Sequence, residues 1–367
     1  MQKNWQRMRQ DQFFSDQLLL REQVIKAIRK FFDQENFHEV ETPLLVRSPG
    51  TEPYLEVFAT RLVDEQDKAQ EAYLLTSPEY AMKKLLVAGL ENIYQICKSF
   101  RNHESFGDTH NPEFTILEWY RSQADYQKIM DDFARLMLFI SQELQSYYQQ
   151  QKGDFAQAIL ARLQGDSVEY LGKKYYLTIP YPKMTVAEAF AKYLGINDQQ
   201  LLDRDQLYHL AQDKGYPLTA KDSWDDLFYQ LFLNEIEPNL AKLAQPVIIY
   251  DYPLSQAALA KKKQNDPRFA ERFEVYLAGL ELGNAFSELT DYREQEERLK
   301  AELVLRKKLK KTSYQLDQDF IEALKLGMPE SGGIAVGVDR LIMFFAGVND
   351  INQVLFFPAQ EIFQQVS

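Results

Sequence analysis

The feature that most constrains the fold is a polar segment between two short runs of β-forming residues, within the stretch FRNHESFGDTHNPEFTILEWYR at 100–121. The two runs, 93–101 and 113–121, predict an antiparallel hairpin with the polar segment as its loop. Alternation of side chains along a strand places four residues of the second run on one face: Phe114, Ile116, Glu118 and Tyr120. A carboxylate and a phenol on this face indicate a binding surface, because a plain core face would be apolar throughout.

Arg101 lies where the first run enters the loop. A guanidinium group at that place can grip a phosphate through two parallel hydrogen bonds. The hairpin therefore predicts an anion site beside its mixed face.

Composition limits the partners and the location of the protein. The 367 residues are 45% hydrophobic, enough for one large domain or two small ones, and the formal net charge is −12. An acidic chain repels a nucleic-acid backbone unless its basic residues cluster, which disfavours RNA as the main partner. The single cysteine, Cys97, excludes an internal disulfide, and no apolar run reaches the ~20 residues of a membrane span. We expect a cytoplasmic protein without a membrane partner.

Periodicity and polarity divide the chain into segments. Residues 1–15 are polar and predict an N-terminal arm, and helical spacing of apolar residues follows to about 33. Residues 37–45 read as a strand that ends in a proline turn, and 126–149 as a long amphipathic helix. The segment at about 150–245 predicts a mainly helical insertion in one domain that spans 16–367.

The segment Ser77-Pro78-Glu79 predicts a helix start. Ser77 suits the N-cap, Pro78 the first helical position and Glu79 the acidic first turn. An ordinary helix start explains all three residues, and a free carboxylate there can also receive a cation.

Two carboxylates in the segment 279–291 lie seven residues apart. On a straight strand Glu281 and Glu288 would point to opposite faces. The pair Gly283-Asn284 is where a bulge could bring both to one side. Carboxylate oxygens are ligands that suit Mg²⁺.

The last motif is a glycine-rich run at 332–337, followed by a predicted helix that carries Arg340 in its first turn. Glycines on a strand let a ligand approach the backbone closely. The run therefore predicts a second place where an arginine meets a bound ligand.

Three of these segments resemble the motifs of class II aminoacyl-tRNA synthetases, and most closely those of lysyl-tRNA synthetases. Residues 16–45 resemble motif 1, Phe100-Arg101 with HNPEFT and EWY at 110–120 resemble motif 2, and 332–343 resembles motif 3. The resemblance implies an α+β fold, with an antiparallel sheet flanked by helices and no anticodon-binding domain. It also implies a homodimer formed through motif 1.

The resemblance implies ATP and Mg²⁺ as cofactors, with Arg101 and Arg340 as the catalytic cations. The residues implied to bind ATP are Arg101, Asn102, His103, Glu104, Asn111, Phe114, Glu281, Leu282, Gly337 and Arg340. Those implied to bind the amino acid are Ser77, Pro78, Glu79, Glu118, Tyr120, Glu288 and Ala335. The implied metal ligands are Glu281 and Glu288, with Glu288 serving either the metal or the distal amine of the substrate.

Two departures from the family pattern stand out. His103 occupies the position where the family usually has a glutamate, so either His103 or Glu104 takes that role. Ala335 stands where lysyl-tRNA synthetases place glycine, which narrows the pocket by one methyl group.

The chain also resembles synthetase paralogues that modify translation elongation factor P. This resemblance implies ATP-dependent activation of (R)-β-lysine or lysine as an adenylate, and transfer to a lysine ε-amine of the factor. It makes tRNA an unlikely partner, because motif 1 begins at once and leaves no room for an anticodon reader. The alternatives are a truncated lysyl-tRNA synthetase that charges tRNA and a non-catalytic paralogue that binds amino acids.

Overall fold

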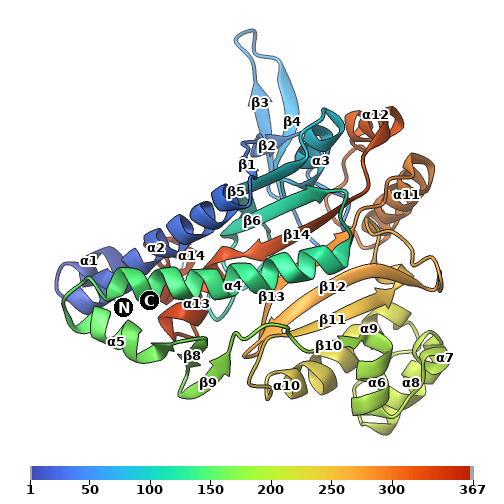
Figure 1. Ribbon diagram of the computed structural model, residues 1–367. Coiled ribbons are helices and arrows are strands. Elements are labelled where there is room, and N and C mark those ends of the chain that lie inside the picture. Colours follow the sequence, from blue (N-terminus) through green and yellow to red (C-terminus); the bar gives the residue numbers. More distant parts are fainter. Residues whose placement is uncertain (1, 364–367) are drawn as a thin grey trace.

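An eight-stranded sheet forms the centre of the protein, for which a computed structural model describes residues 2–363 (Figure 1). Its strands in spatial order are β1 (His38–Glu39), β5 (Asn92–Phe100), β6 (Glu113–Ser122), β14 (Ser331–Gly337), β13 (Leu280–Ser287), β12 (Phe269–Leu277), β11 (Val247–Pro253) and β10 (Lys183–Thr185). The six inner strands are antiparallel, as expected, but the two edge pairs β1–β5 and β10–β11 are parallel. A parallel pair needs a long crossover, and the chain supplies one at each edge, through 40–91 and through the helices of the insertion.

The predicted hairpin is confirmed as β5 and β6, which pair along their full length from Asn92↔Arg121 to Phe100↔Glu113. The odd-numbered residues Leu117 and Trp119 are fully buried in the core. The even-numbered residues of β6 point to the opposite face, where they line a cavity. The period of two in this strand therefore separates the core from the cavity.

Two long helices cover the core face of the sheet. α2 (Gln12–Gln34) and α4 (Tyr126–Tyr148) run side by side across it, with α13 (Val338–Ala346) close to them (Figure 1). The apolar stripe of α4 is completely buried, including Ile129, Phe133 and Ile140. This layer leaves the other face of the sheet free for the cavity.

The N-terminal segment differs from the frayed arm that its polarity suggested. It contains α1 (Asn4–Met8) and the first turn of α2, which Asp11 caps by accepting a hydrogen bond from the Phe14 amide. The Asn4 side chain donates to the carbonyl groups of Asn352 and Leu355 at 2.7 and 2.8 Å. The two ends of the described chain therefore lie together (Figure 1), beside η3 (Ile351–Val354) and α14 (Ala359–Phe363).

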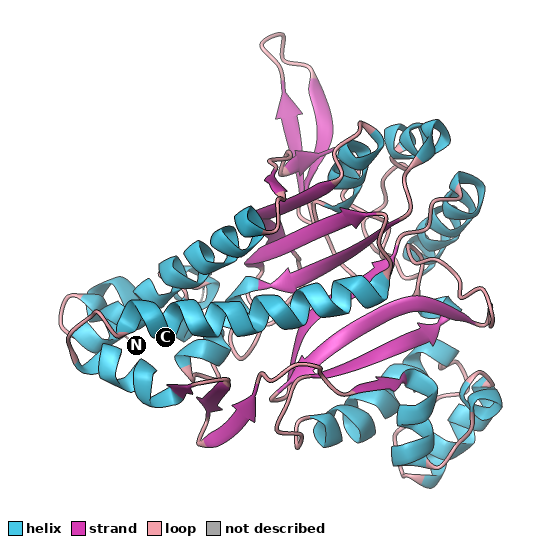
Figure 2. Ribbon diagram, viewed as in Figure 1, coloured by secondary structure: helices cyan, strands magenta, loops and turns pink. Residues whose placement is uncertain are grey.

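Smaller elements surround this centre (Figure 2). A three-stranded sheet of β2 (Leu45–Val46), β4 (Ala69–Leu74) and β3 (Ala59–Val63) ends in a hairpin that projects from the body, and a second one contains β7 (Leu163–Gln164), β8 (Ser167–Tyr170) and β9 (Lys173–Tyr176). The helices α3 (Glu79–Val87) and α11 (Tyr292–Lys308) lie beside the cavity, and α12 (Gln318–Gly327) packs against α3. The short turn η2 (Leu254–Gln256) follows β11.

The segment at about 150–245 is mainly helical. Its helices are α5 (Asp154–Arg162), α6 (Val186–Leu194), α7 (Asp198–Leu201), α8 (Arg204–Asp213), α9 (Trp224–Leu231), the π-turn η1 (Phe232–Ile236) and α10 (Glu237–Leu240). Phe190, Phe228 and Phe232 are buried and stack on one another in a second hydrophobic cluster against β11 and β12. Within residues 2–363, no helix has the length and apolar character that crossing a membrane requires.

Candidate active site

A cavity of about 580 Å³ opens on the free face of the sheet, between β6, β13 and β14 on one side and α3, α9 and α11 on the other. Most of the site residues predicted from the sequence line it: Ser77, Glu79, Arg101, Glu104, Asn111, Phe114, Glu118, Tyr120, Glu281, Leu282, Ala335, Gly337 and Arg340. Segments more than 250 residues apart in the chain thus contribute to one chamber.

Four predicted residues do not line the cavity. The amide of Asn102 pairs with the Glu56 carbonyl at 2.9 Å, and the exposed His103 follows it. Pro78 is the N-cap of α3, so this helix begins one residue later than expected. Glu288 lies behind the wall, fully buried.

The structure separates the two candidates for the acid of the hairpin loop. Glu104 lines the cavity, whereas His103 is exposed and has a φ of 60°, in the left-handed region. Of the two alternatives, this geometry favours Glu104.

One end of the cavity, here called the cationic end, is formed by Arg101, Phe114, His110, Arg340 and Glu281. The Arg101 guanidinium lies 5.0 Å from the centre of the Phe114 ring, and its Nε is buried without a hydrogen-bond partner in the described chain. An unused buried donor is costly unless a ligand accepts from it. This end of the cavity is therefore suited to an anion.

Arg340 is held by its neighbours. Its Nη1 donates to the Glu281 carbonyl at 2.8 Å, and its Nη2 lies 3.1 Å from Nε2 of His110. Burial and the Arg340 charge lower the pKa of His110, so the neutral ring accepts this hydrogen bond. The neighbouring Asp339 accepts from the Thr115 amide at 2.7 Å and pairs with Arg21, which fixes the start of α13 against β6.

The other end, here called the carboxylate end, is lined by Ser77, Glu79, Glu118 and Tyr120, with Lys83 and Glu288 buried directly behind them. Glu118 accepts hydrogen bonds from Ser77 Oγ at 2.6 Å and from the Tyr120 hydroxyl at 3.0 Å. Burial, with a smaller effect of the Glu79 charge, raises the pKa of Glu118 to about 8. A cation in this end would restore the charged form.

Glu288 belongs to the carboxylate end, and the structure does not bring it to Glu281. Its Oε2 forms an ion pair with Lys83, and its Oε1 is buried without a hydrogen-bond partner among residues 2–363. Burial raises the pKa of Glu288 to about 8, while Lys83 counteracts the rise and Glu79 adds to it. Of the two roles that the sequence left open for Glu288, this position favours contact with an amine.

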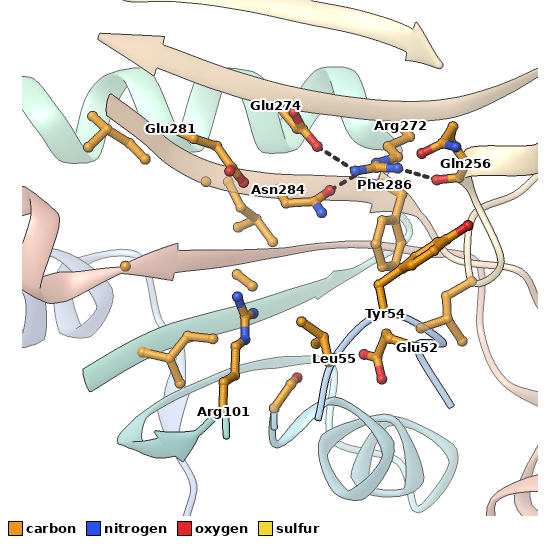
Figure 3. A pocket seen from close by; sticks show the side chains of 18 of the residues that line it. Glu52, Tyr54, Leu55, Arg101, Gln256, Arg272, Glu274, Glu281, Asn284 and Phe286 are labelled. Atoms are coloured by element: carbon orange, nitrogen blue, oxygen red, sulfur yellow. Dashed lines mark hydrogen bonds and ion pairs between the residues drawn. The ribbon is translucent and has the colours of Figure 1, made fainter. Parts of the chain in front are cut away.

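A bulge on β13 places Glu281 on the cavity face of the sheet, and the length of the strand separates it from Glu288. Gly283 faces Val275 and Glu281 faces Tyr276, so Leu282 is the additional residue. The Gly283-Asn284 pair was expected to carry such a bulge, which instead falls one residue earlier. It turns Glu281 into the cavity, opposite Arg101 (Figure 3).

The residues that could hold a divalent cation are Glu281 and Glu274 on the adjacent strand. Burial and the Glu274 charge raise the pKa of Glu281, and a bound cation would relieve this repulsion. Glu274 pairs with Arg272 (Figure 3), and it also accepts from the Tyr252 hydroxyl at 2.7 Å. No group of three or more potential metal ligands occurs within residues 2–363. Such an ion would therefore need oxygen ligands from its substrate as well.

Sequence reasoning missed several residues of the cavity wall. Arg272 and Glu274 alternate on β12, and Lys83 follows Glu79 by one helical turn, so both patterns were readable signals. Glu52 and Glu302, from a loop and from α11, carry no such signal and meet only in the fold. The insertion, in which the sequence shows no chemical motif, contributes Asp225, Tyr229 and Glu237.

This fold and this cavity define the catalytic domain of a class II tRNA synthetase. The family model described as tRNA synthetases class II (D, K and N) matches residues 1–361, and the chain belongs to this family. Among curated proteins, the chain is 37% identical over 344 residues to the Elongation factor P–(R)-beta-lysine ligase of Avibacterium paragallinarum. The match covers 94% of this chain and 95% of that relative.

Proposed function

We propose that the protein is an ATP-dependent ligase that activates (R)-β-lysine or lysine as an aminoacyl-adenylate and transfers it to a lysine ε-amine of translation elongation factor P. The observation that carries the proposal is one cavity with unused guanidinium donors at one end and buried carboxylates at the other. A substrate that combines a phosphate chain with two ammonium groups fits both ends. The similarity to the named relative extends over almost the entire chain and supports the acceptor.

In the first step the substrate carboxylate attacks the α-phosphorus of ATP, and pyrophosphate leaves. The difficulty of this step is the accumulation of negative charge. Arg101 and Arg340 are the residues that would stabilise this charge, and Phe114 would stack on the adenine. Asn111, Leu282 and Gly337 would complete the nucleotide site. Mg²⁺, held by Glu281 with Glu274, would neutralise phosphate charge when it is bound.

The carboxylate end would bind the two amino groups of the substrate. Glu288, whose buried Oε1 is free, and Tyr120 would receive the distal amine, and Glu79 with Ser77 the other. A buried ammonium group requires such acids, because an unpaired charge there is prohibitive. In the second step the acceptor amine attacks the carbonyl carbon of the adenylate, an amide forms, and AMP leaves with the former carboxylate oxygen.

Assembly and location belong to the same proposal. The motif 1 segment, with α2 and β1, would form a homodimer, and the protein would work in the cytoplasm. Residues 16–367 would act as one catalytic domain with the insertion at about 150–245 as part of it.

The experiment that tests the proposal follows a labelled substrate. Purified protein is incubated with ATP and radiolabelled lysine or (R)-β-lysine, together with either elongation factor P or tRNA. Label on the factor supports the proposal, and label on tRNA alone refutes it in favour of a truncated synthetase. Pyrophosphate exchange is measured in parallel, and its absence with every lysine isomer would indicate a paralogue that binds without turnover.

A further inference from the structure

Lys83 is a buried cation at the carboxylate end, to which the proposed reaction assigns no step. It lies on α3 one turn after Glu79, and its side chain is 1% exposed. Its Nζ pairs with Oε1 of Glu79 and with Oε2 of Glu288, and lies 5.2 Å from the centre of the Phe286 ring. Burying an ammonium group is expensive, so a lysine in this position needs both partners.

The two carboxylates come from different elements, and Lys83 connects them. Glu79 opens α3, whereas Glu288 follows β13 directly, where its amide donates to the Ser331 carbonyl at 2.8 Å. Each ion pair uses one oxygen of its carboxylate. The second oxygen of Glu288 is buried and has no partner within residues 2–363, so a donor that is not part of this chain is missing there.

The charges of this end also match a particular ligand. Three carboxylates, Glu79, Glu118 and Glu288, lie around one cation, Lys83, with the hydroxyls of Ser77 and Tyr120 beside them. Glu52 and Glu302 also lie near Glu79, because burial and the Glu79 charge raise the pKa of both. Carboxylates therefore outnumber cations here, and a ligand with ammonium groups offsets this excess of negative charge.

We propose that Lys83 is a positioning residue that holds Glu79 and Glu288 in place for the amino groups of a diamino acid and offsets part of the negative charge of the carboxylate end. This inference rests on the proposed function and adds a determinant of substrate selection to it. Removal of Lys83 leaves three carboxylates without an internal counter-ion. Two of them then lose their fixed position, and the proton affinity of Glu288 rises.

The test compares Lys83→Met with wild type and with Lys84→Met. Lys84 is the matched control, because it lies on the same helix but forms its ion pair with Asp317, at 2.8 Å, and not with Glu79 or Glu288. Pyrophosphate exchange gives KM separately for the diamino acid and for ATP. We expect Lys83→Met to raise KM for the diamino acid on the order of 10–100-fold and to leave KM for ATP within about 2-fold. Lys84→Met should change neither constant.

Three further readouts separate positioning from a merely structural effect. The pH profile of kcat/KM for the diamino acid should move to higher pH in Lys83→Met, because the acids lose the cation that favours their charged forms. Added ethylammonium should restore part of the lost activity in Lys83→Ala, whose short side chain leaves room for it, and have no effect on wild type. Lys83→Arg, which keeps the charge, should recover most of the affinity.

Several outcomes would overturn the inference. One is an unchanged KM and pH profile in folded Lys83→Met, and another is an equal rise of KM for ATP. Should Lys83→Met fail to fold, Lys83→Gln and Lys83→Arg decide the matter, and equal affinity of these two variants for the diamino acid overturns the inference.

Binding of the diamino acid, measured by calorimetry, distinguishes failure of this inference from failure of the proposed function. If wild type binds the diamino acid without turnover, the proposed function is refuted, while the variants still report on Lys83. If wild type binds no diamino acid, both proposals are refuted.

Discussion

The cationic end and the carboxylate end of the cavity are built in opposite ways. Arg101 lies over the Phe114 ring, and its buried Nε has no partner among residues 2–363, so an anionic ligand can accept from it. At the carboxylate end, Glu118 accepts from two hydroxyls, and Glu79 and Glu288 share Lys83. A guanidinium group stays charged without a partner, whereas a buried carboxylate needs hydrogen-bond donors or a cation within the protein to stay charged and bind an ammonium group.

The largest effect should come from removing the cation of the open end. Arg101→Ala should lower pyrophosphate exchange on the order of 10²–10³-fold, because one charge-stabilising donor is lost in the transition state. The rate is measured at saturating ATP and diamino acid. Arg61→Ala, at an exposed site on the projecting hairpin, is the matched control. A loss below about 3-fold in Arg101→Ala would break the contrast between the two ends.

An added methyl group can displace side chains at the carboxylate end without changing its charge. A Cβ at Gly333 would overlap the Tyr120 ring and Oε1 of Glu288. Gly333→Ala should cost about 1–3 kcal/mol in binding of the diamino acid, or ~5–150-fold in its KM, since overpacking displaces both side chains. KM for ATP should stay within about 2-fold. Gly337→Ala is the comparison, because a Cβ there meets only ordinary contacts with Arg340.

A change of pH should alter binding of the diamino acid at the carboxylate end more than binding of ATP at the cationic end. Glu118 has a pKa of about 8, so below this pH it is largely protonated in the free protein and cannot pair with an ammonium group. The kcat/KM for the diamino acid should therefore rise about 10-fold between pH 6.5 and 8.5, with KM for ATP nearly constant.

The raised pKa of Glu118 also has a consequence for stability. The folded state holds this proton more tightly than the unfolded chain, so the contribution of Glu118 to stability falls as pH rises from the ordinary carboxyl range to about 8 in the free protein. Added diamino acid should reverse the fall, as measured by thermal unfolding. If the pH profile of kcat/KM is flat in wild type and remains flat in Glu118→Gln, Glu118 does not control binding of the diamino acid.

The smallest effect should come from the cavity wall between the two ends. Ala335 lines the cavity and pairs with Glu118 across β14 and β6. Ala335→Gly should change the ratio of kcat/KM for (R)-β-lysine and lysine by about 5-fold, because one methyl group alters which isomer fits. Competition between the two isomers in one reaction measures this ratio. An unchanged ratio would assign the choice of isomer to the carboxylates alone.

Much of this architecture was predictable because the signals are local. The hairpin β5–β6 and the mixed face of β6 follow from a period of two, and the stripe of α4 follows from a period of 3.6. Arg340 in the first turn of its helix follows from the glycine-rich run before it. The resemblance of these segments to known motifs gave the family, which the match over residues 1–361 bears out.

Other features could not be read from the chain. The parallel edge strands depend on where distant crossovers return, and the structured N-terminal helix depends on carbonyl groups near residue 352. The positions of Glu52 and Glu302 in the same wall have no local signal at all.

The sequence by itself determined the hairpin, the glycine-rich strand and the identity of the charged residues, because each depends on neighbours within a few positions. Tertiary structure alone decided that Glu288 faces Lys83 and not Glu281, and that Arg101 keeps an open donor. The reason is physical: pairing between charges depends on distance through space, and the bulge at Leu282 and the packing of α3 set those distances.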